Sequence, residues 1–262
     1  MTDSFAVGEA ATPLAGEIAT LNARFAGAGA SAVLRYALER FGSRLAVACS
    51  LGLEDVVVLD ILASLGVGAE SASAPAPRVI TLDTGRLPEA TYELLDRVRA
   101  RYPGLAVDIY FPDAIRVERL VREKGPLSFR HSVEDRKECC AIRKLAPLAR
   151  ALAGTDAWVT GLRRGQSGAR ADTALFEIDS ANEGRFKISP LADWSDEDVW
   201  RYVREHEVPY NTLHDEGYPS IGCAPCTRAV LPGEDSRSGR WWWESSTSSR
   251  ECGLHSPRRP RR

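Results

Sequence analysis

Residues 44–55 read RLAVACSLGLED, and this stretch decides the fold. Arg44–Ala48 predicts a short buried strand, Ser50–Leu53 a small turn with one glycine, and Glu54–Leu65 a helix with acidic residues in its first turn. Such a turn presents backbone N–H groups, and the start of the helix adds positive potential. It can bind an anion, although an ordinary strand-to-helix turn would look the same.

Strands and helices continue to alternate along the chain. We expect helices over residues 13–25, 31–41, 88–102, 113–124 and 140–152, and strands over 78–82, 106–110 and 157–162. The helix over 140–152 would break or start near Pro147, Arg185–Pro190 would add an edge strand, and Ser195 would cap a helix running to about His206. This alternation predicts an α/β fold with a doubly wound, mostly parallel sheet.

The composition divides the chain into three segments. Residues 1–30 are rich in Ala and Gly and form an expected N-terminal helical extension. Residues 31–210 carry the alternating pattern and form the expected nucleotide-binding α/β domain. Residues 211–262 are loop-like, contain three of the six cysteines (Cys223, Cys226 and Cys252), and end in PRRPRR. We expect this last segment to carry chemistry rather than core.

The overall composition is that of an ordinary globular protein. The 262 residues are 44% hydrophobic and 27% charged, and the formal net charge is −2, so nothing global indicates nucleic acid or an anionic membrane as a partner. No apolar run approaches the roughly 20 residues of a membrane span, and the first ten residues lack the basic start of a secretory signal. We expect a cytoplasmic protein with no membrane or nucleic-acid partner. The oligomeric state stays open, a homo-oligomer included.

Three loops are expected to meet at one edge of the sheet, because open parallel sheets bind ligands beyond the C-terminal ends of their strands. Arginines spaced by glycines in the third loop suit oxyanion binding. Each loop alone is equally typical of a helix cap or a solvated surface, but their convergence favours nucleotide binding. The candidate binding residues are Ser50 and Gly52 in the first loop, Leu82 and Thr84 in the second, and Gly161, Arg163, Arg164 and Arg170 in the third.

Four of the six cysteines form two pairs, Cys139-Cys140 and Cys223–Cys226, the second a CxxC. Four thiolates in two pairs suit zinc or an iron–sulfur cluster. Adjacent ligands are awkward, because neighbours on a helix point about 100° apart, and one redox-active CxxC with two buried thiols is the alternative. The basic surroundings of the first pair suit a thiolate-ligated centre near an anionic substrate.

Cys252 stands apart from both pairs, in Glu251–His255, which reads ECGLH. A lone cysteine near a chain end is usually incidental. Here Gly253 gives mobility, and His255 and nearby arginines favour the thiolate. A mobile nucleophile in this position can visit two sites in turn.

Together these residues resemble the assimilatory, thioredoxin-dependent adenosine 5′-phosphosulfate (APS) reductases of the phosphoadenosine phosphosulfate reductase family, from about Ser50 to His255. The turn at 50–55 is similar to that family's modified pyrophosphate (PP) loop. The two cysteine pairs resemble its [4Fe–4S] ligand set. Residues 237–244, RSGRWWWE, together with ECGLH, resemble its C-terminal signature.

The resemblance implies a sheet of the adenine-nucleotide alpha-hydrolase (PP-loop) type with a C-terminal catalytic tail. It implies that Cys252 is the nucleophile and that Ser50, Leu82 and Gly161 lie near the adenosine. The implied phosphosulfate-binding residues are Lys144, Arg170, Arg237, Arg240 and His255, and the implied [4Fe–4S] ligands are Cys139, Cys140, Cys223 and Cys226. The expected products are AMP and an S-sulfocysteine, from which thioredoxin or a similar dithiol protein releases sulfite, in sulfate assimilation and cysteine biosynthesis.

Three alternatives accompany this interpretation. The first is the same chemistry on the 3′-phosphorylated nucleotide, although relatives that use it generally lack the cluster cysteines. The second is an ATP-using thiolation enzyme of the same fold, which needs an intact Ser-Gly-Gly-x-Asp-Ser loop where this chain has Leu51, Glu54 and Asp55. The third is a metal-binding redox sensor whose PRRPRR tail contacts nucleic acid.

Overall fold

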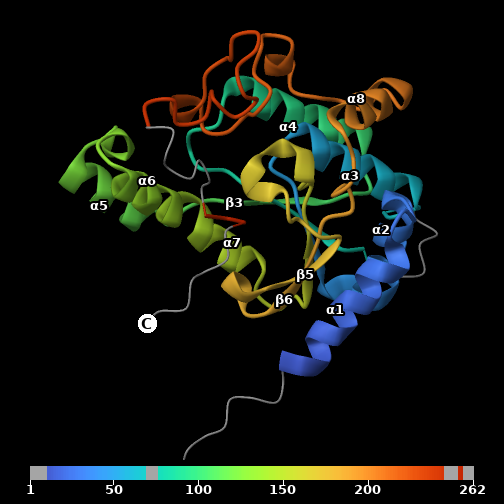
Figure 1. The fold of residues 1–262 in the computed structure, drawn as a ribbon. Coiled ribbons are helices and arrows are strands. Elements are labelled where there is room, and N and C mark those ends of the chain that lie inside the picture. Colours follow the sequence, from blue (N-terminus) through green and yellow to red (C-terminus); the bar gives the residue numbers. More distant parts are fainter. Residues whose placement is uncertain (1–10, 69–75, 245–252, 256–262) are drawn as a thin grey trace, which may run out of the picture.

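The computed structural model describes residues 11–68, 76–244 and 253–255 (Figure 1). Within these residues six strands form one sheet, in the order β3-β2-β1-β4-β6-β5. The strands are β1 (Leu45–Ala48), β2 (Arg78–Leu82), β3 (Val107–Tyr110), β4 (Ala157–Val159), β5 (Phe176–Asp179) and β6 (Arg185–Ile188). Every neighbouring pair is parallel except β5 with β6. The prediction of a doubly wound, mostly parallel α/β sheet is confirmed.

Helices cover both faces of the sheet (Figure 1). They are α1 (Ala11–Phe25), α2 (Ala30–Phe41), α3 (Leu53–Ser64), α4 (Glu89–Arg101), α5 (Ala114–Lys124), α6 (Val133–Cys140), α7 (Ala146–Ala151) and α8 (Asp196–Glu205). Helices α1 to α4 and α8 pack with Val47, Val79 and Val159 into the main core. Helix α7 packs on the opposite face, against Ala46 and Trp158.

Helix α3 is apolar on nearly every side because it is enclosed on nearly every side. Nine of its twelve residues are buried, which is the pattern of a helix inside a core rather than at a surface. Its burial fixes the turn before it, at residues 49–52, against the C-terminal ends of the strands. This turn therefore lies between the inner strand β1 and a buried helix.

The expected edge strand at Arg185–Pro190 is wrong in its position. Strand β6 lies inside the sheet, parallel to β4 and antiparallel to β5, and β5, which the sequence pattern did not predict, forms the edge. Helix α1 covers that edge, where the amide of Asn22 donates to the carbonyl of Phe176 at 2.9 Å and accepts from its N–H at 3.1 Å. A side chain that mimics a neighbouring strand protects an exposed edge from pairing.

The helix expected over 140–152 begins earlier than predicted. Ser132 caps α6 by accepting from the N–H of Asp135 at 3.0 Å, and the helix then continues through a π-helical turn, Ala141–Leu145, into α7. Pro147 lies in the first turn of α7, where its missing N–H costs little. Single π-helical turns are frequent at functional sites, and this one contains Lys144 and directly follows Cys140.

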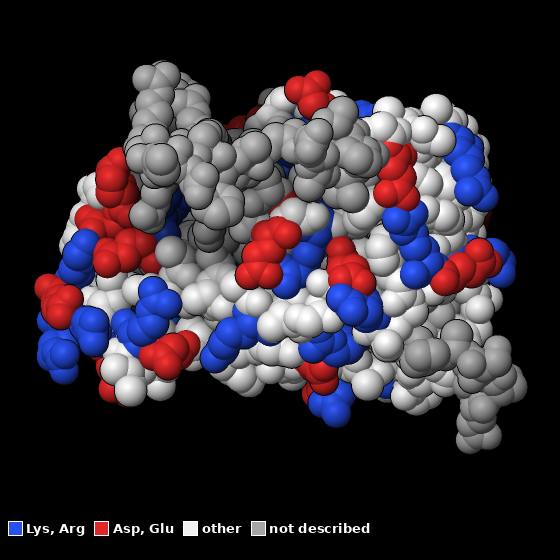
Figure 2. Space-filling view, turned by 90° about the horizontal axis from the view of Figure 1, so that it is seen from below, with Lys and Arg blue, Asp and Glu red and all other residues white. Residues whose placement is uncertain are grey.

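Charged side chains of both signs alternate over the face shown in Figure 2. None of the helices in the described part of the chain has both the length and the apolar composition that crossing a bilayer requires.

Candidate active site

A cavity of about 530 Å³ opens at the C-terminal ends of β1, β2 and β4. Strand β1 lies between β2 and β4, so the chain leaves it in one direction and returns on its other side. Ligands of open α/β sheets bind at such a reversal. All three loops predicted from the sequence line this cavity, through Ser50, Gly52, Leu82, Thr84, Gly161, Arg163 and Arg170.

The buried carboxylate of Asp55 fixes the conformation of the first loop. One oxygen of Asp55 accepts from the N–H and the hydroxyl of Ser50, both at 2.6 Å, and the other accepts from the N–H of Gly161 at 3.0 Å. A Cβ on Gly161 would lie 2.6 Å from that second oxygen, so only glycine allows the two loops to approach this closely. Leu51 adopts a φ of 61°, a left-handed conformation that glycine adopts more easily.

Glu54 is neutralised rather than aimed at a ligand. Its carboxylate accepts from Arg163 at 2.7 and 2.9 Å and from the amide of Gln166 at 2.9 Å. Arg163 also pairs with Asp196. Burial would lower the pKa of Arg163, but Glu54 and Asp196 raise it above its ordinary value. Arg163 lines the cavity, but its charge is already paired. It therefore attracts a bound anion more weakly than the sequence predicted.

Arg164 does not reach the cavity. Its guanidinium donates to the carbonyl of Thr173 at 2.7 Å and pairs with Asp193. Arg170, in contrast, lines the cavity, where it donates to the side-chain amide oxygen of Gln166 at 2.5 Å. Of the three arginines in this loop, Arg170 is therefore the best placed to meet a bound anion.

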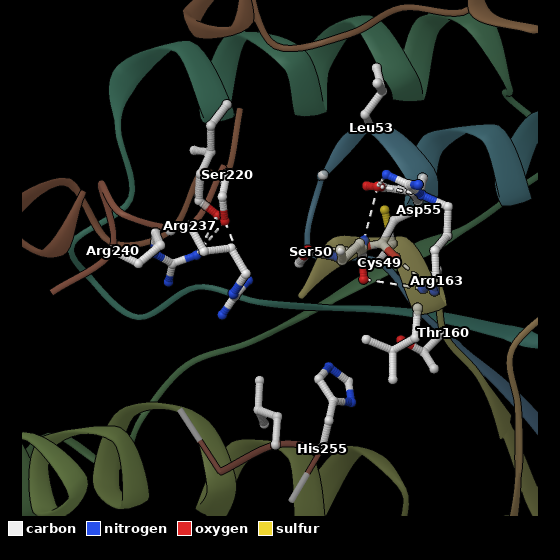
Figure 3. A pocket seen from close by; sticks show the side chains of 18 of the residues that line it. Cys49, Ser50, Leu53, Asp55, Thr160, Arg163, Ser220, Arg237, Arg240 and His255 are labelled. Atoms are coloured by element: carbon white, nitrogen blue, oxygen red, sulfur yellow. Dashed lines mark hydrogen bonds and ion pairs between the residues drawn. The ribbon is translucent and has the colours of Figure 1, made fainter. Parts of the chain in front are cut away.

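Opposite the first loop, the C-terminal segment forms a cationic wall. Figure 3 shows Arg237 and Arg240 with Ser220 across the cavity from Ser50 and Asp55. The Ser220 hydroxyl lies 3.4 Å from Arg237 and 3.3 Å from Arg240. A Cβ at position 222 would lie 2.2 Å from the end of the Arg240 guanidinium, so Gly222 makes room for this arginine. Lys144 enters the same cavity from the π-helical turn.

The described residues after Cys252, 253–255, add His255 to the lining of this cavity. Its ring lies parallel to the indole of Trp158, with 5.8 Å between the ring centroids, and Leu254 packs beside it. Burial lowers the pKa of His255 well below its ordinary value, and the cations around it lower it further: Arg170, Lys187, Arg237 and Lys144. The ring is therefore neutral at neutral pH. Cys252, the predicted nucleophile, lies outside the described residues.

The four paired cysteines line one small second cavity, which Lys144, Arg240 and Trp241 share with the first. Cys139 and Cys140, the last two residues of α6, both line it. The Thr84 hydroxyl lies 3.2 Å from the Cys223 sulfur. The second predicted loop thus joins the nucleotide cavity to the cysteines.

The charges around the thiols suit a thiolate-bound centre. Burial opposes the Cys223 thiolate, but Lys144, the Thr84 hydroxyl and two arginines hold its pKa below the ordinary value. Burial and the neighbouring Cys223 raise the pKa of Cys226 to about 12. The Nε atoms of Arg143 and Arg240 are buried without a hydrogen-bond partner in the described part of the chain. Unpaired donors beside thiols are what an anionic occupant would satisfy.

The four thiols are a donor set for a thiolate-ligated centre. In the described ranges, no three or more His, Cys, Asp or Glu side chains converge closely enough to hold a single ion. A [4Fe–4S] cube takes one thiolate at each of four separated corners, so its ligands need not converge on a point. Four cysteines around one buried, cation-lined cavity meet that requirement.

A buried ion pair fastens the C-terminal segment to the cysteine helix. Arg136 on α6 and Glu244 pair through two hydrogen bonds, and their side chains are 0% and 4% exposed. The Arg136 guanidinium also lies 4.5 Å from the ring centroid of Trp241. The wall that carries Arg237 and Arg240 is thereby fixed to the helix that carries Cys139 and Cys140.

Sequence reasoning missed several residues of the cavity. His214 and Trp200 meet edge to face at its rim, and burial lowers the pKa of His214. The segment 219–222, directly before the CxxC, also lines it. The position of this segment next to the cysteines was the one feature of the sequence that could have indicated its place in the cavity. Its loop composition predicts no contact with a ligand.

Comparisons with known proteins agree with this geometry. The profile of the phosphoadenosine phosphosulfate reductase domain matches residues 44–229. The adenosine 5′-phosphosulfate reductase of Allochromatium vinosum is 50% identical over 217 residues, 81% of this chain and 80% of that protein, and the one of Pseudomonas aeruginosa is 47% identical over 228 residues, 85% and 80%. The crystal structure of the phosphoadenylyl-sulfate reductase from Candida auris, a phosphate complex, superimposes with a TM-score of 0.66 and 28% identity, covering 87% of this chain and all of that one.

Proposed function

Because the chain belongs to the phosphoadenosine phosphosulfate reductase family, we propose that it reduces adenosine 5′-phosphosulfate to sulfite and AMP, as its relatives of about 50% identity are named for doing. The observation that carries this proposal is the cavity itself. It has a nucleotide-sized volume at the sheet's reversal point, a cationic wall, and Leu254 and His255, which follow Cys252 in the chain, in its lining. The reaction belongs to sulfate assimilation and supplies cysteine biosynthesis.

The two ends of the cavity suit the two ends of this substrate. The loops at 50–55, 82–84 and 160–161 supply small side chains and backbone groups for the adenosine. Lys144, Arg170, Arg237 and Arg240 gather where the phosphosulfate would lie. Preorganised cations stabilise charge that develops in a transition state. Neutral His255 can add a ring N–H donor without adding to their mutual repulsion.

In the first step the Cys252 thiolate attacks the sulfate sulfur. A sulfur–sulfur bond forms to Cys252, the bond between that sulfur and the bridging oxygen breaks, and AMP leaves. The leaving phosphate has a second pKa of about 6, so it departs as an anion and needs cations rather than a proton donor. The wall at Arg237 and Arg240 would serve this need.

In the second step a thiolate of thioredoxin, or of a similar dithiol protein, attacks the Cys252 sulfur and sulfite leaves. The second thiol of the dithiol protein then releases Cys252 and closes a disulfide. The two electrons that reduce the sulfate group therefore come from the two thiols. Cys139, Cys140, Cys223 and Cys226 would hold the [4Fe–4S] cluster, whose chemistry when bound is a fixed local field beside Lys144.

The test of this function is sulfite release by anaerobically purified protein with a dithiol donor. We expect kcat/KM for adenosine 5′-phosphosulfate to exceed that for its 3′-phosphorylated form, and the reverse order would assign the second substrate. The visible spectrum of the same sample should show thiolate-to-iron absorption, while a colourless protein with bound zinc would contradict the cluster. The cytoplasmic location and the dithiol partner remain parts of the proposal.

A further inference from the structure

Three consecutive tail residues contact one surface, formed by the π-helical turn, α7 and β4. A Cβ on Gly253 would lie 3.7 Å from a methyl of Leu145. Leu254 packs against the apolar cluster that contains Leu148 and Trp158, and His255 stacks on Trp158. Figure 3 shows His255 on the α7 side of the cavity, below the Ser50 loop. The tail is thus held by side chains that the proposed chemistry does not otherwise use.

Trp158 is the rigid part of that surface. Its side chain is 1% exposed, on a strand paired on both sides. Its indole N–H donates to Asp179 on β5 at 3.1 Å, which fixes the ring's rotation. The ring therefore offers one face in one orientation.

The His255 ring meets that face almost parallel, with 11° between the planes. Lys144, Arg170, Lys187 and Arg237 surround the ring, so a positive imidazole is disfavoured and two neutral rings stack. Offset stacking has a preferred geometry that apolar contact alone lacks. The stack can thus set the register of the chain as well as hold it.

We propose that Trp158 is a positioning residue for the C-terminal tail. Its indole face, with Leu254 beside it, fixes the register in which His255 meets the phosphosulfate. Through the covalent chain it also restricts where the thiol of Cys252 can reach. This inference rests on the proposed function, because it assigns Trp158 to the sulfur-transfer step.

A first experiment reads the docking without substrate. Ring protons of His255, assigned with a His255→Gln variant, should show an upfield ring-current shift in NMR spectra of the full chain. Trp158→Leu should abolish that shift and Trp158→Phe should keep part of it. Leu254→Ala, a change in the tail rather than in the sheet, should also reduce it. Trp194→Leu, which removes an indole that packs on Tyr202, is the control and should leave it.

A second experiment follows single-turnover sulfonation of Cys252 by intact mass, with adenosine 5′-phosphosulfate and no dithiol. Loss of a stack of this kind should slow Trp158→Leu roughly three- to tenfold, with Trp158→Phe within about twofold of the parent. In a His255→Ala background the effect of Trp158→Leu should vanish, because residues that act together are not additive. A merely structural role would slow both backgrounds equally.

Unchanged His255 shifts in Trp158→Leu and Leu254→Ala, or equal slowing in both backgrounds, would overturn the inference. If the parent protein gains no sulfonate, the proposed function fails instead. The NMR comparison still decides whether Trp158 seats the tail, so the two failures are distinguishable.

Discussion

Breaking the ion pair between Arg136 and Glu244 should cost the fold about 3–5 kcal/mol. The side chains are 0% and 4% exposed, so solvent screens neither charge. Glu244→Gln keeps the shape of the side chain but removes the negative charge that faces the buried Arg136 guanidinium, which lies against the ring of Trp241. For a chain of this size that loss corresponds to a fall in Tm of roughly 6–20 °C.

The assay is urea unfolding followed by circular dichroism, with protein purified and kept under anaerobic conditions. The matched control is Asp156→Asn, because Asp156 pairs with Arg44 where both side chains are largely exposed, 46% and 62%. An exposed pair contributes at most about 1 kcal/mol. The double variant Arg136→Met with Glu244→Leu should recover most of the stability, since apolar groups of similar size can replace a buried pair.

Two results would refute this reasoning. One is a Glu244→Gln protein as stable as the Asp156→Asn control, which would mean that the guanidinium finds water or another acceptor. The other is a double variant as unstable as the single one, which would place the loss in packing rather than in an unpaired charge.

Three further predictions concern the cavity. Gly161→Ala puts a methyl 2.6 Å from a carboxylate oxygen and should weaken AMP binding about 5- to 150-fold by calorimetry. The control Gly165→Ala, whose added methyl would have its nearest contact at 3.8 Å, should leave AMP binding unchanged. Equal AMP affinities of the two variants would contradict the close approach of the loops. Gly222→Ala displaces Arg240 and should lower kcat roughly 10²-fold, and an unchanged kcat would remove Arg240 from the reaction. The docked His255 ring should show no protonation by NMR as the pH falls through the free-ring pKa of about 6.5, because the pKa of the docked ring is lowered. Docking is therefore strongest above the pKa of the free ring and weakens as the pH falls below it, because only the released ring takes a proton. A docked ring that titrates near 6.5 would contradict the burial argument.

The alternating α/β architecture and the loop convergence could be predicted from the sequence because both follow from local patterns. Strands that alternate with helices place their C-terminal ends at one edge, and the three predicted loops do line one cavity. The ion pair between Glu54 and Arg163 could not be predicted. Glu54 and Arg163 lie 109 residues apart, and only the fold brings them together, where each neutralises the other.

The cysteine pair shows the same limit. A regular helix would point Cys139 and Cys140 about 100° apart, which made two adjacent ligands look awkward. Both residues nevertheless line one cavity with Cys223 and Cys226, which cannot be read from spacing alone. Strand β5 was missed because its edge is completed by the side chain of Asn22 on a helix far away in the sequence.

The central claim is that Cys252 carries the sulfonate. Anaerobic protein incubated with adenosine 5′-phosphosulfate and no dithiol should gain one sulfonate by intact mass, located on the peptide that contains Cys252, and should release one AMP. The Cys252→Ser variant should bind the nucleotide, gain no sulfonate and release no AMP. A sulfonated Cys252→Ser protein, or AMP release without a sulfonated cysteine in the parent, would contradict the account.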